Sequence, residues 1–168
     1  MGLFDSLFGN DPSTNWPEHV TKILSLNLAD LSLNSLTIGT SAHELSAFGR
    51  PSNKRPFKEK RFTYHKLGIE IEIENDLVSY FAFPLARQPN DFTGPCALTL
   101  VLPNGSRSSV DSNTDVKDLL ENLPAPMETH REKDETIYFI SIEGNTLELE
   151  TSTDGLIRRI NVLQGTEL

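Results

Sequence analysis

The sequence contains a single cysteine, Cys96, among 168 residues, so an internal disulfide framework is excluded. Cys96 stands at the start of an apolar run, and we expect a small buried side chain rather than a reactive thiol. No stretch approaches the ~20 apolar residues that a membrane-spanning helix needs. The N-terminus lacks the basic segment and the long apolar core of a secretory signal. Together these absences predict a cytoplasmic protein.

Basic residues are also scarce. Lysine and arginine number 15 against 24 aspartates and glutamates, which gives a formal net charge of −9. Nucleic-acid binding requires a basic footprint, so we expect no nucleic-acid partner. Residues 50–66 are basic and rich in aromatic residues, a composition that single-strand binding surfaces share. A solvated loop that balances the acidic C-terminal half is the favoured interpretation of this segment.

The sequence has no recognisable catalytic motif. It lacks the G-x-S-x-G nucleophile elbow and the glycine-rich phosphate loop, and its four histidines are not paired at metal-ligand spacing. Glu128, His130 and Glu132 would share one face of a strand, but a metal ion would need further ligands, so a charged loop is favoured. We therefore predict no catalytic residue, no cofactor, no metal site and no enzymatic activity.

What the sequence does contain is a strict alternation of apolar and acidic residues, which occurs twice. Residues 68–83, GIEIEIENDLVSYFAF, predict a strand, a turn and a second strand, and residues 145–162, NTLELETSTDGLIRRINV, repeat the pattern. Alternate side chains of a strand point to opposite faces, so the acidic side chains gather on one face. These side chains are Glu70, Glu72, Glu74, Glu148 and Glu150. We interpret the repetition as an internal duplication.

A short helix is expected ahead of the strands in each copy. Ser41 and Glu44 form a capping box before an apolar stripe, and Gly49 ends the stripe. Residues 113–127 contain a similar capped helix that ends at a proline. Residues 97–110 are candidates for two further strands around an Asn-Gly turn.

These elements predict an α+β fold. We expect two tandem units, each a helix followed by antiparallel strands, that form one shared sheet or two abutting sheets with the helices on one side. Unit 1 spans 31–85 and unit 2 spans 97–168, with a connector at 86–96 that is rich in turn-forming residues. Residues 1–30 form a helical N-terminal extension, which includes a helix predicted at 16–26.

Two short motifs flank the first predicted helix, and they carry a resemblance. Ile-Gly-Thr precedes the helix, Gly-x-Pro ends it, and antiparallel strands follow; the matching residues are Ile38, Gly39, Thr40, Leu45, Gly49 and Pro51. Residues 31–83 thereby resemble the repeating unit of bacterial proteins built like β-lactamase inhibitory protein, and small outer-membrane assembly lipoproteins have related units. Residues 97–163 match more faintly, because Leu123 replaces the helix-ending glycine. The resemblance implies a two-copy α+β scaffold whose exposed sheet binds protein, and it carries over no functional residue.

These features favour a non-catalytic protein-binding module, such as an immunity-type protein or a small inhibitor. The five strand glutamates are the predicted contact face: Glu70, Glu72, Glu74, Glu148 and Glu150. Their charge would steer a basic protein partner towards the sheet. The competing interpretation is that these glutamates only keep the surface soluble.

Two other functions stay open. The first is a peripheral adaptor, because Leu3, Phe4, Leu7 and Phe8 fall on one face of a short amphipathic helix. Residues 1–9 would then contact a membrane surface or a larger assembly. The second is a small hydrolase or ligand binder that has no recognisable motif.

Overall fold

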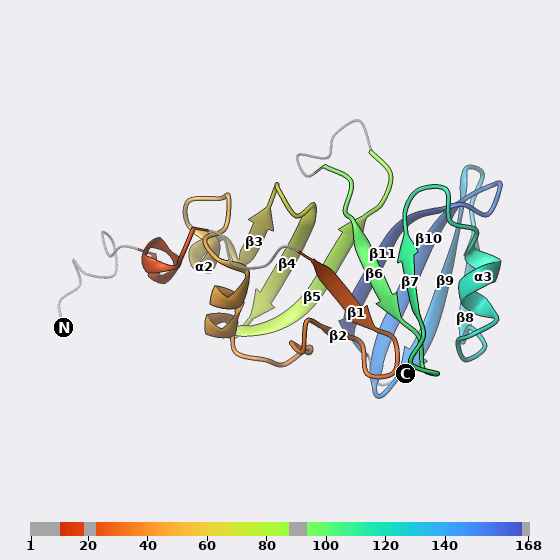
Figure 1. The fold of residues 1–168 in the computed structure, drawn as a ribbon, viewed down its shortest axis with the longest axis horizontal. Helices are drawn as coiled ribbons and strands as arrows, with labels where there is room; N and C mark the ends of the chain where they lie inside the picture. Colours follow the sequence, from red (N-terminus) through yellow and green to blue (C-terminus); the bar gives the residue numbers. More distant parts are fainter. Residues whose placement is uncertain (1–10, 19–22, 88–93, 166–168) are drawn as a thin grey trace.

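Strands build two sheets (Figure 1) in a computed structural model that describes residues 11–18, 23–87 and 94–165. The large sheet has seven strands in the order β3-β4-β5-β11-β10-β9-β8, and the small sheet has four in the order β2-β1-β6-β7. The strands of the large sheet are β3 (Arg61–Tyr64), β4 (Ile69–Glu74), β5 (Leu77–Pro84), β8 (Glu128–Arg131), β9 (Glu135–Ile142), β10 (Asn145–Ser152) and β11 (Ile157–Gln164). Those of the small sheet are β1 (Leu24–Asn27), β2 (Ser32–Leu33), β6 (Leu98–Val101) and β7 (Arg107–Val110).

The apolar face of the large sheet packs against the small sheet. In β4, Ile69 and Ile71 are buried, while the glutamates between them face the other way. Figure 1 shows β1, β6 and β7 crossing in front of β5 and β11. Side chains of both sheets join one buried cluster, which includes Leu26 of β1, Leu100 of β6 and Phe81 of β5. The two sheets therefore share a core.

Short helical segments lie at the margins of the sheets. The described ones are the 3₁₀-helices η1 (Pro12–Asn15) and η2 (Ala42–Phe48) and the α-helices α2 (Pro56–Glu59) and α3 (Val116–Leu120). Ser41 caps η2 by accepting a hydrogen bond from His43 N, and Asp115 caps α3 by accepting one from Lys117 N. The cap at Ser41 is the predicted one, and of the two candidates that the sequence offers for the second cap, Thr114 and Asp115, the structure has Asp115.

Both predicted hairpins are present, because β4 pairs with β5 and β10 pairs with β11. The first hairpin turns at Asn75 and Asp76, whose φ angles of 51° and 61° are those that a tight two-residue turn requires. Each hairpin also exchanges two backbone hydrogen bonds with the residues around a helix cap. These bonds are Ala42 N to Asp76 O and Val78 N to Thr40 O in the first, and Val116 N to Gly155 O and Ile157 N to Thr114 O in the second. Because β5 pairs with β11, the hairpins lie side by side.

The predicted α+β fold class is wrong. The chain is mostly β, and a four-stranded sheet lies where the prediction placed a layer of helices. The described helices are too short to cover a sheet, so the small sheet, and not a layer of helices, buries the apolar face. This sheet depends on a parallel pairing between β1 and β6, which are distant in the sequence, and such a pairing leaves no local pattern. The predicted unit boundaries at 31–85, 86–96 and 97–168 stay predictions.

The helix predicted at 16–26 is also wrong where the structure describes it. Leu24–Asn27 form strand β1, with alternating burial, and Ile23 just before it is 71% exposed. Residues 19–22 lie outside the described residues. So do the side chains predicted for membrane or partner contact, which are Leu3, Phe4, Leu7 and Phe8. Within the described ranges, no helix has the length and apolar character that a membrane crossing demands.

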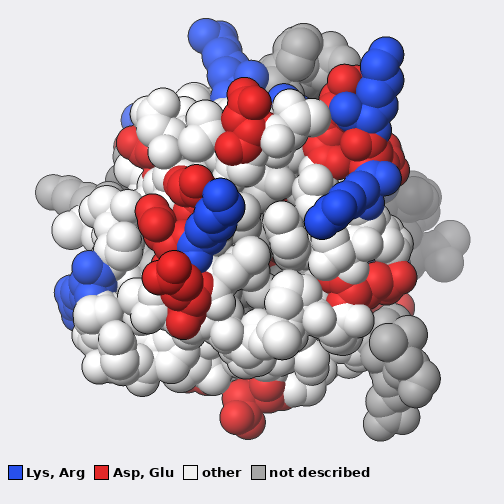
Figure 2. Space-filling view, turned by 90° about the vertical axis from the view of Figure 1, so that its right-hand side faces the viewer, with Lys and Arg blue, Asp and Glu red and all other residues white. Residues whose placement is uncertain are grey.

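Charge is distributed in separate groups on the side of the molecule that carries α3, β8 and β9. Figure 2 shows acidic side chains there in several clusters, most of them close to a lysine or arginine, with uncharged residues between them. The net negative charge of the chain does not form one continuous acidic patch on this side.

Candidate functional site

The outer face is the side of the large sheet that points away from the small sheet. The strand register places Glu70, Ala82, Asn161 and Glu148 in one row across β4, β5, β11 and β10. The charged and polar residues that we assign to this face are Arg61, Glu70, Glu72, Glu74, Tyr80, Glu148, Glu150, Arg159 and Asn161. All five predicted glutamates thus share one face. They form two groups, on β4 and on β10, which are about 14 Å apart because β5 and β11 lie between them.

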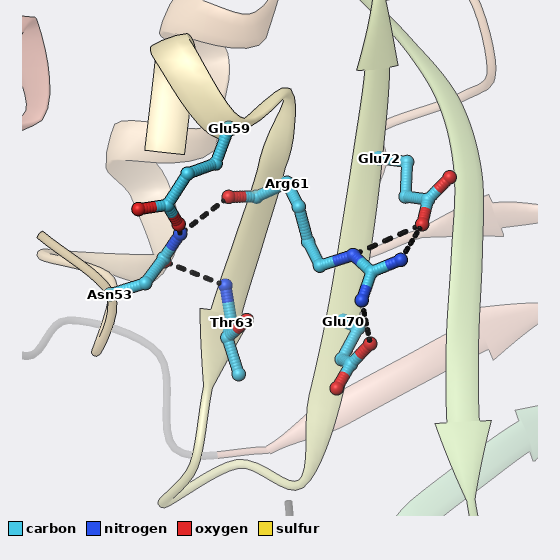
Figure 3. A network of polar contacts seen from close by, with 6 residues as sticks. All are labelled: Asn53, Glu59, Arg61, Thr63, Glu70 and Glu72. Atoms are coloured by element: carbon cyan, nitrogen blue, oxygen red, sulfur yellow. Dashed lines mark hydrogen bonds and ion pairs between the residues drawn. The ribbon is translucent and has the colours of Figure 1, made fainter. Parts of the chain in front are cut away.

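Arg61 binds the first group of glutamates (Figure 3). Its Nη2 and Nε donate to Glu72 Oε1 at 2.5 and 3.1 Å, and its Nη1 lies 3.7 Å from Glu70 Oε2. The hydrogen bond to Glu72 raises the pKa of the guanidinium, although partial burial opposes the shift. One arginine therefore fixes two carboxylates, while Glu74, at the end of β4, is exposed.

Asn161 binds the second group of glutamates. Its side chain is 1% exposed, and its Nδ2 donates to Glu148 Oε1 at 2.5 Å and to Glu150 Oε1 at 2.9 Å. Burial raises the pKa of Glu150; Arg159 and the Asn161 bond lower it, and Glu148 raises it further. An amide oxygen turned towards two carboxylates would be repelled, so Nδ2 must face them. The oxygen Oδ1 is consequently buried without a hydrogen-bond partner among the described residues.

Tyr80 of β5 lies between the two groups and is coupled to both. Burial raises its pKa, Arg159 lowers it, and Glu148, Glu150 and Glu72 raise it. The phenol is therefore neutral at physiological pH, and its hydroxyl is able to donate or accept a hydrogen bond. Tyr80 thus lies within the electrostatic influence of both groups of glutamates.

An open groove of about 640 Å³ borders the outer face where β4 ends and β5 begins. The pairing of these strands shifts at this point, so that Ser79 is an extra residue in β5, which is the geometry of a β-bulge. Lys60, Glu72 and Glu74 are among the lining residues. Three carboxylates and two cationic side chains line the groove, since Glu59 and Arg61 join the residues just named.

Cys96 is buried, as predicted from the sequence. Burial raises the pKa of its thiol to about 12, so the thiol is protonated and has little nucleophilic character at physiological pH.

The charged loop predicted around His130 is instead strand β8. Glu128 and His130 share a face of this strand, with Oε1 and Nε2 2.6 Å apart, whereas Glu132 follows the strand end. Across the described part of the chain, no cluster of three or more His, Cys, Asp or Glu side chains has the arrangement of a metal site.

The aromatic residues of the basic segment 50–66 belong to the core. Trp16 stacks on Phe62 with ring centroids 5.7 Å apart and meets Phe57 edge-on at 5.9 Å. Phe62 is fully buried, and Tyr64 is buried with its hydroxyl donating to Leu45 O. These rings are therefore not arranged as a platform on which bases stack.

Sequence reasoning missed the residues that position the glutamates, namely Arg61, Tyr80, Arg159 and Asn161. Part of the signal was present, because each of them alternates with apolar residues along its strand and so faces away from the core. The missing information was the pairing of β5 with β11, which brings Tyr80 and Asn161 between the two acidic strands.

Neither protein-family models nor curated proteins gave a match to this chain. Among solved structures, the chain is similar to the crystal structure of a DUF4309 family protein (YjgB) from Bacillus subtilis subsp. subtilis str. 168. The TM-score is 0.50 and the sequence identity is 16%, over 81% of this chain and 88% of that chain. At this identity the likeness concerns the fold alone. The resemblance to β-lactamase inhibitory protein stays a prediction.

Proposed function

We propose that this chain is a non-catalytic protein-binding module, of the kind that immunity proteins and small inhibitors represent, and that its outer face binds a basic protein. The observation that carries the proposal is a half-buried polar network on the face of the large sheet opposite the small sheet. Glu148 and Glu150 are held by a side chain that is itself buried, so their geometry is set before any partner arrives. Fixed charges lose little side-chain entropy on binding.

The shape and charge of the outer face indicate the class of partner. Strands of an antiparallel sheet present a broad surface, which suits another protein better than a small molecule. Five glutamates lie on this face beside Arg61 and Arg159, so its balance is acidic. A complementary basic surface would be steered to it and oriented by it. Tyr80 supplies an aromatic anchor with a polar end, a residue type that is enriched at interfaces.

A defined basic probe tests the face directly. A decalysine peptide is titrated into the isotope-labelled chain, and backbone amide shifts are followed by NMR. We expect the shifts to map to β4, β5, β10 and β11 and to weaken as salt is added. The variant E70K/E74K should bind the peptide about tenfold more weakly, which equals ~1.4 kcal/mol. The control E121K alters an exposed acidic residue beside α3, away from this face, and should leave the affinity unchanged.

The same variants identify a physiological partner. A basic protein captured on the immobilised chain qualifies only if E70K/E74K abolishes its binding and E121K does not. If the decalysine shifts lie away from the outer face, or if E121K weakens binding as much as E70K/E74K, the outer face is not the binding surface.

A further inference from the structure

The two edge strands of the large sheet, β3 and β8, differ in whether their outward N–H and C=O groups have hydrogen-bond partners. At the β3 edge, Ser52 N donates to Thr63 O at 2.7 Å, and Asn53 Oδ1 accepts from Thr63 N at 3.1 Å (Figure 3). Asn53 Nδ2 also donates to Arg61 O at 2.7 Å and to Glu59 Oε2 at 2.6 Å. Two residues of the preceding loop therefore occupy the outward groups of β3, and this edge is closed to another strand.

The β8 edge is open by comparison. All four residues of β8 are exposed, and within the described chain β8 pairs with β9 alone. The bond from Glu132 N to Glu135 O continues the register in which His130 is opposite Ile137. Hydrogen-bonded and non-hydrogen-bonded pairs alternate in an antiparallel ladder, so His130 points its backbone groups at β9. Thr129 and Arg131 then turn their N–H and C=O groups outward.

We propose that β8 pairs antiparallel with β8 of a second copy of this chain, centred on Thr129. The outward backbone groups belong to alternate residues, so four registers come into question, centred on Glu128, Thr129, His130 or Arg131; the Arg131-centred register sets two arginines opposite each other. Centring on Glu128 brings two glutamates face to face, and centring on His130 brings two histidines together. Centring on Thr129 sets Glu128 opposite His130 of the second copy, twice by symmetry. The Glu128–His130 contact, repeated across the two-fold axis, therefore favours the Thr129-centred register.

Side-chain spacing supports this register. Glu128 and His130 of the second copy form non-hydrogen-bonded pairs, in which the Cα atoms are about 4.5 Å apart and the side chains are closest. Each His130 already contacts its own Glu128 at 2.6 Å. The two copies would therefore form a square in which two carboxylates alternate with two imidazoles. Charges on an edge strand discourage pairing when like charges meet. Here these side chains form a selective contact, because of the four registers only the Thr129-centred one places no ionisable side chain opposite its own counterpart.

The inference does not rest on the proposed function of the outer face. It does have a consequence for that face, because a two-fold axis perpendicular to the sheet keeps both outer faces on the same side. Two copies would join edge to edge into one continuous sheet and present two binding faces to the same partner surface. Such bivalent presentation raises the effective affinity without any new contact.

Disulfide trapping tests the register. Thr129 lies on the proposed two-fold axis, where paired Cα atoms are about 5.5 Å apart, within the range that a disulfide spans. T129C should therefore form a covalent dimer under mild oxidation. R131C is the matched control: its side chain is equally exposed on the same strand, but its counterpart would be about 14 Å away. R131C should remain monomeric, and the native Cys96 is buried in both variants.

Sedimentation of the full chain over a range of concentrations tests the reversible dimer. H130E sets glutamates opposite Glu128, and we expect it to weaken the dimer at least tenfold. The double variant E128K/H130E restores opposite charges and should restore the dimer. T129P, which removes an outward N–H and spares the pairing to β9, should abolish it; circular dichroism verifies that each variant folds.

Four outcomes would overturn the inference. They are a wild-type chain that stays monomeric at every concentration, equal trapping of T129C and R131C, a dimer that tolerates T129P, and a dimer that H130E leaves unchanged. If β8 instead binds an extended peptide of another protein, T129P abolishes that binding while sedimentation shows only monomer. That result would reject the second copy as the occupant of this edge.

Discussion

Replacing Asn161 by aspartate should destabilise the fold strongly at neutral pH. The substitution conserves shape but places a carboxyl group where Nδ2 now lies 2.5 Å from Glu148 and 2.9 Å from Glu150. Two unit charges about 3 Å apart repel by ~5 kcal/mol at an effective dielectric constant near 20. The introduced carboxyl group is buried, so it takes up a proton instead of remaining ionised beside two carboxylates. We therefore expect N161D to lower the free energy of unfolding by about 3–5 kcal/mol near pH 7.5.

The sign of the pH dependence follows from proton linkage. The introduced carboxyl has a higher pKa in the native state than the ~3.9 of an unfolded aspartate, so the native state binds more protons. Its penalty is therefore full above the raised native pKa and shrinks as the pH falls towards the unfolded value. The wild-type Glu150, whose pKa is raised by burial, acts in the same direction.

Urea denaturation near pH 7.5 and near pH 5.5 measures the effect. The control is N161L, which removes both hydrogen bonds and adds no charge; it should lose about 2 kcal/mol at both pH values, since the exposed parts of the carboxylates regain water. The difference between N161D and N161L isolates the charge repulsion. If N161D unfolds with the same free energy as N161L at both pH values, the two glutamates are not held against Asn161 as described.

Three further predictions concern the scaffold. G68A should lower the free energy of unfolding by at least about 2 kcal/mol, because Gly68 has φ +70° and a Cβ there would lie 2.6 Å from Gly94 O. G105A, where φ is +81° and the space is open, should lower it by about 1 kcal/mol. Thermal unfolding of the two variants measures the difference. N53A should lower stability by about 1–2 kcal/mol and promote aggregation seen by light scattering, because it exposes the edge of β3. Cys96 should react with a thiol reagent only as fast as the chain unfolds; rapid labelling of the native protein would contradict its burial and raised pKa.

Local patterns predicted the local structure well. The hairpin at 68–83 and the hairpin of β10 and β11 were evident from alternation and turn residues, since both signals lie within a few residues of one another. The cap at Ser41 was evident for the same reason, and the second cap was narrowed to Thr114 or Asp115. Alternation also placed the five glutamates on one face, although their role in binding stays a prediction.

Long-range pairing is the part that the sequence did not show. Leu24 was assigned to a helix because it stands at helical spacing from Val20 and Ile23, whereas pairing with β2 and with the distant β6 makes Leu24–Asn27 a strand. The small sheet then takes the place that we gave to helices. At the candidate site, Asn161 became significant only once β11 was set between β10 and β5, because a polar residue next to two acidic strands has no partner until the strands are ordered.

The two edges of the large sheet show one arrangement terminated in two ways. β3 and β9 take corresponding places, next to β4 and β10 respectively. Beyond β3 the sheet ends, because Asn53 uses a side-chain amide in place of a neighbouring strand. Beyond β9 the chain adds β8. A strand, unlike a side-chain amide, does not end the sheet, because its own outer backbone groups form a new edge. An edge with no use for pairing is usually blocked by proline, a bulge or an inward-pointing charge. β8 is short and carries charged side chains, but Thr129 in its middle is neither proline nor charged, so its outward N–H and C=O are accessible to a second strand.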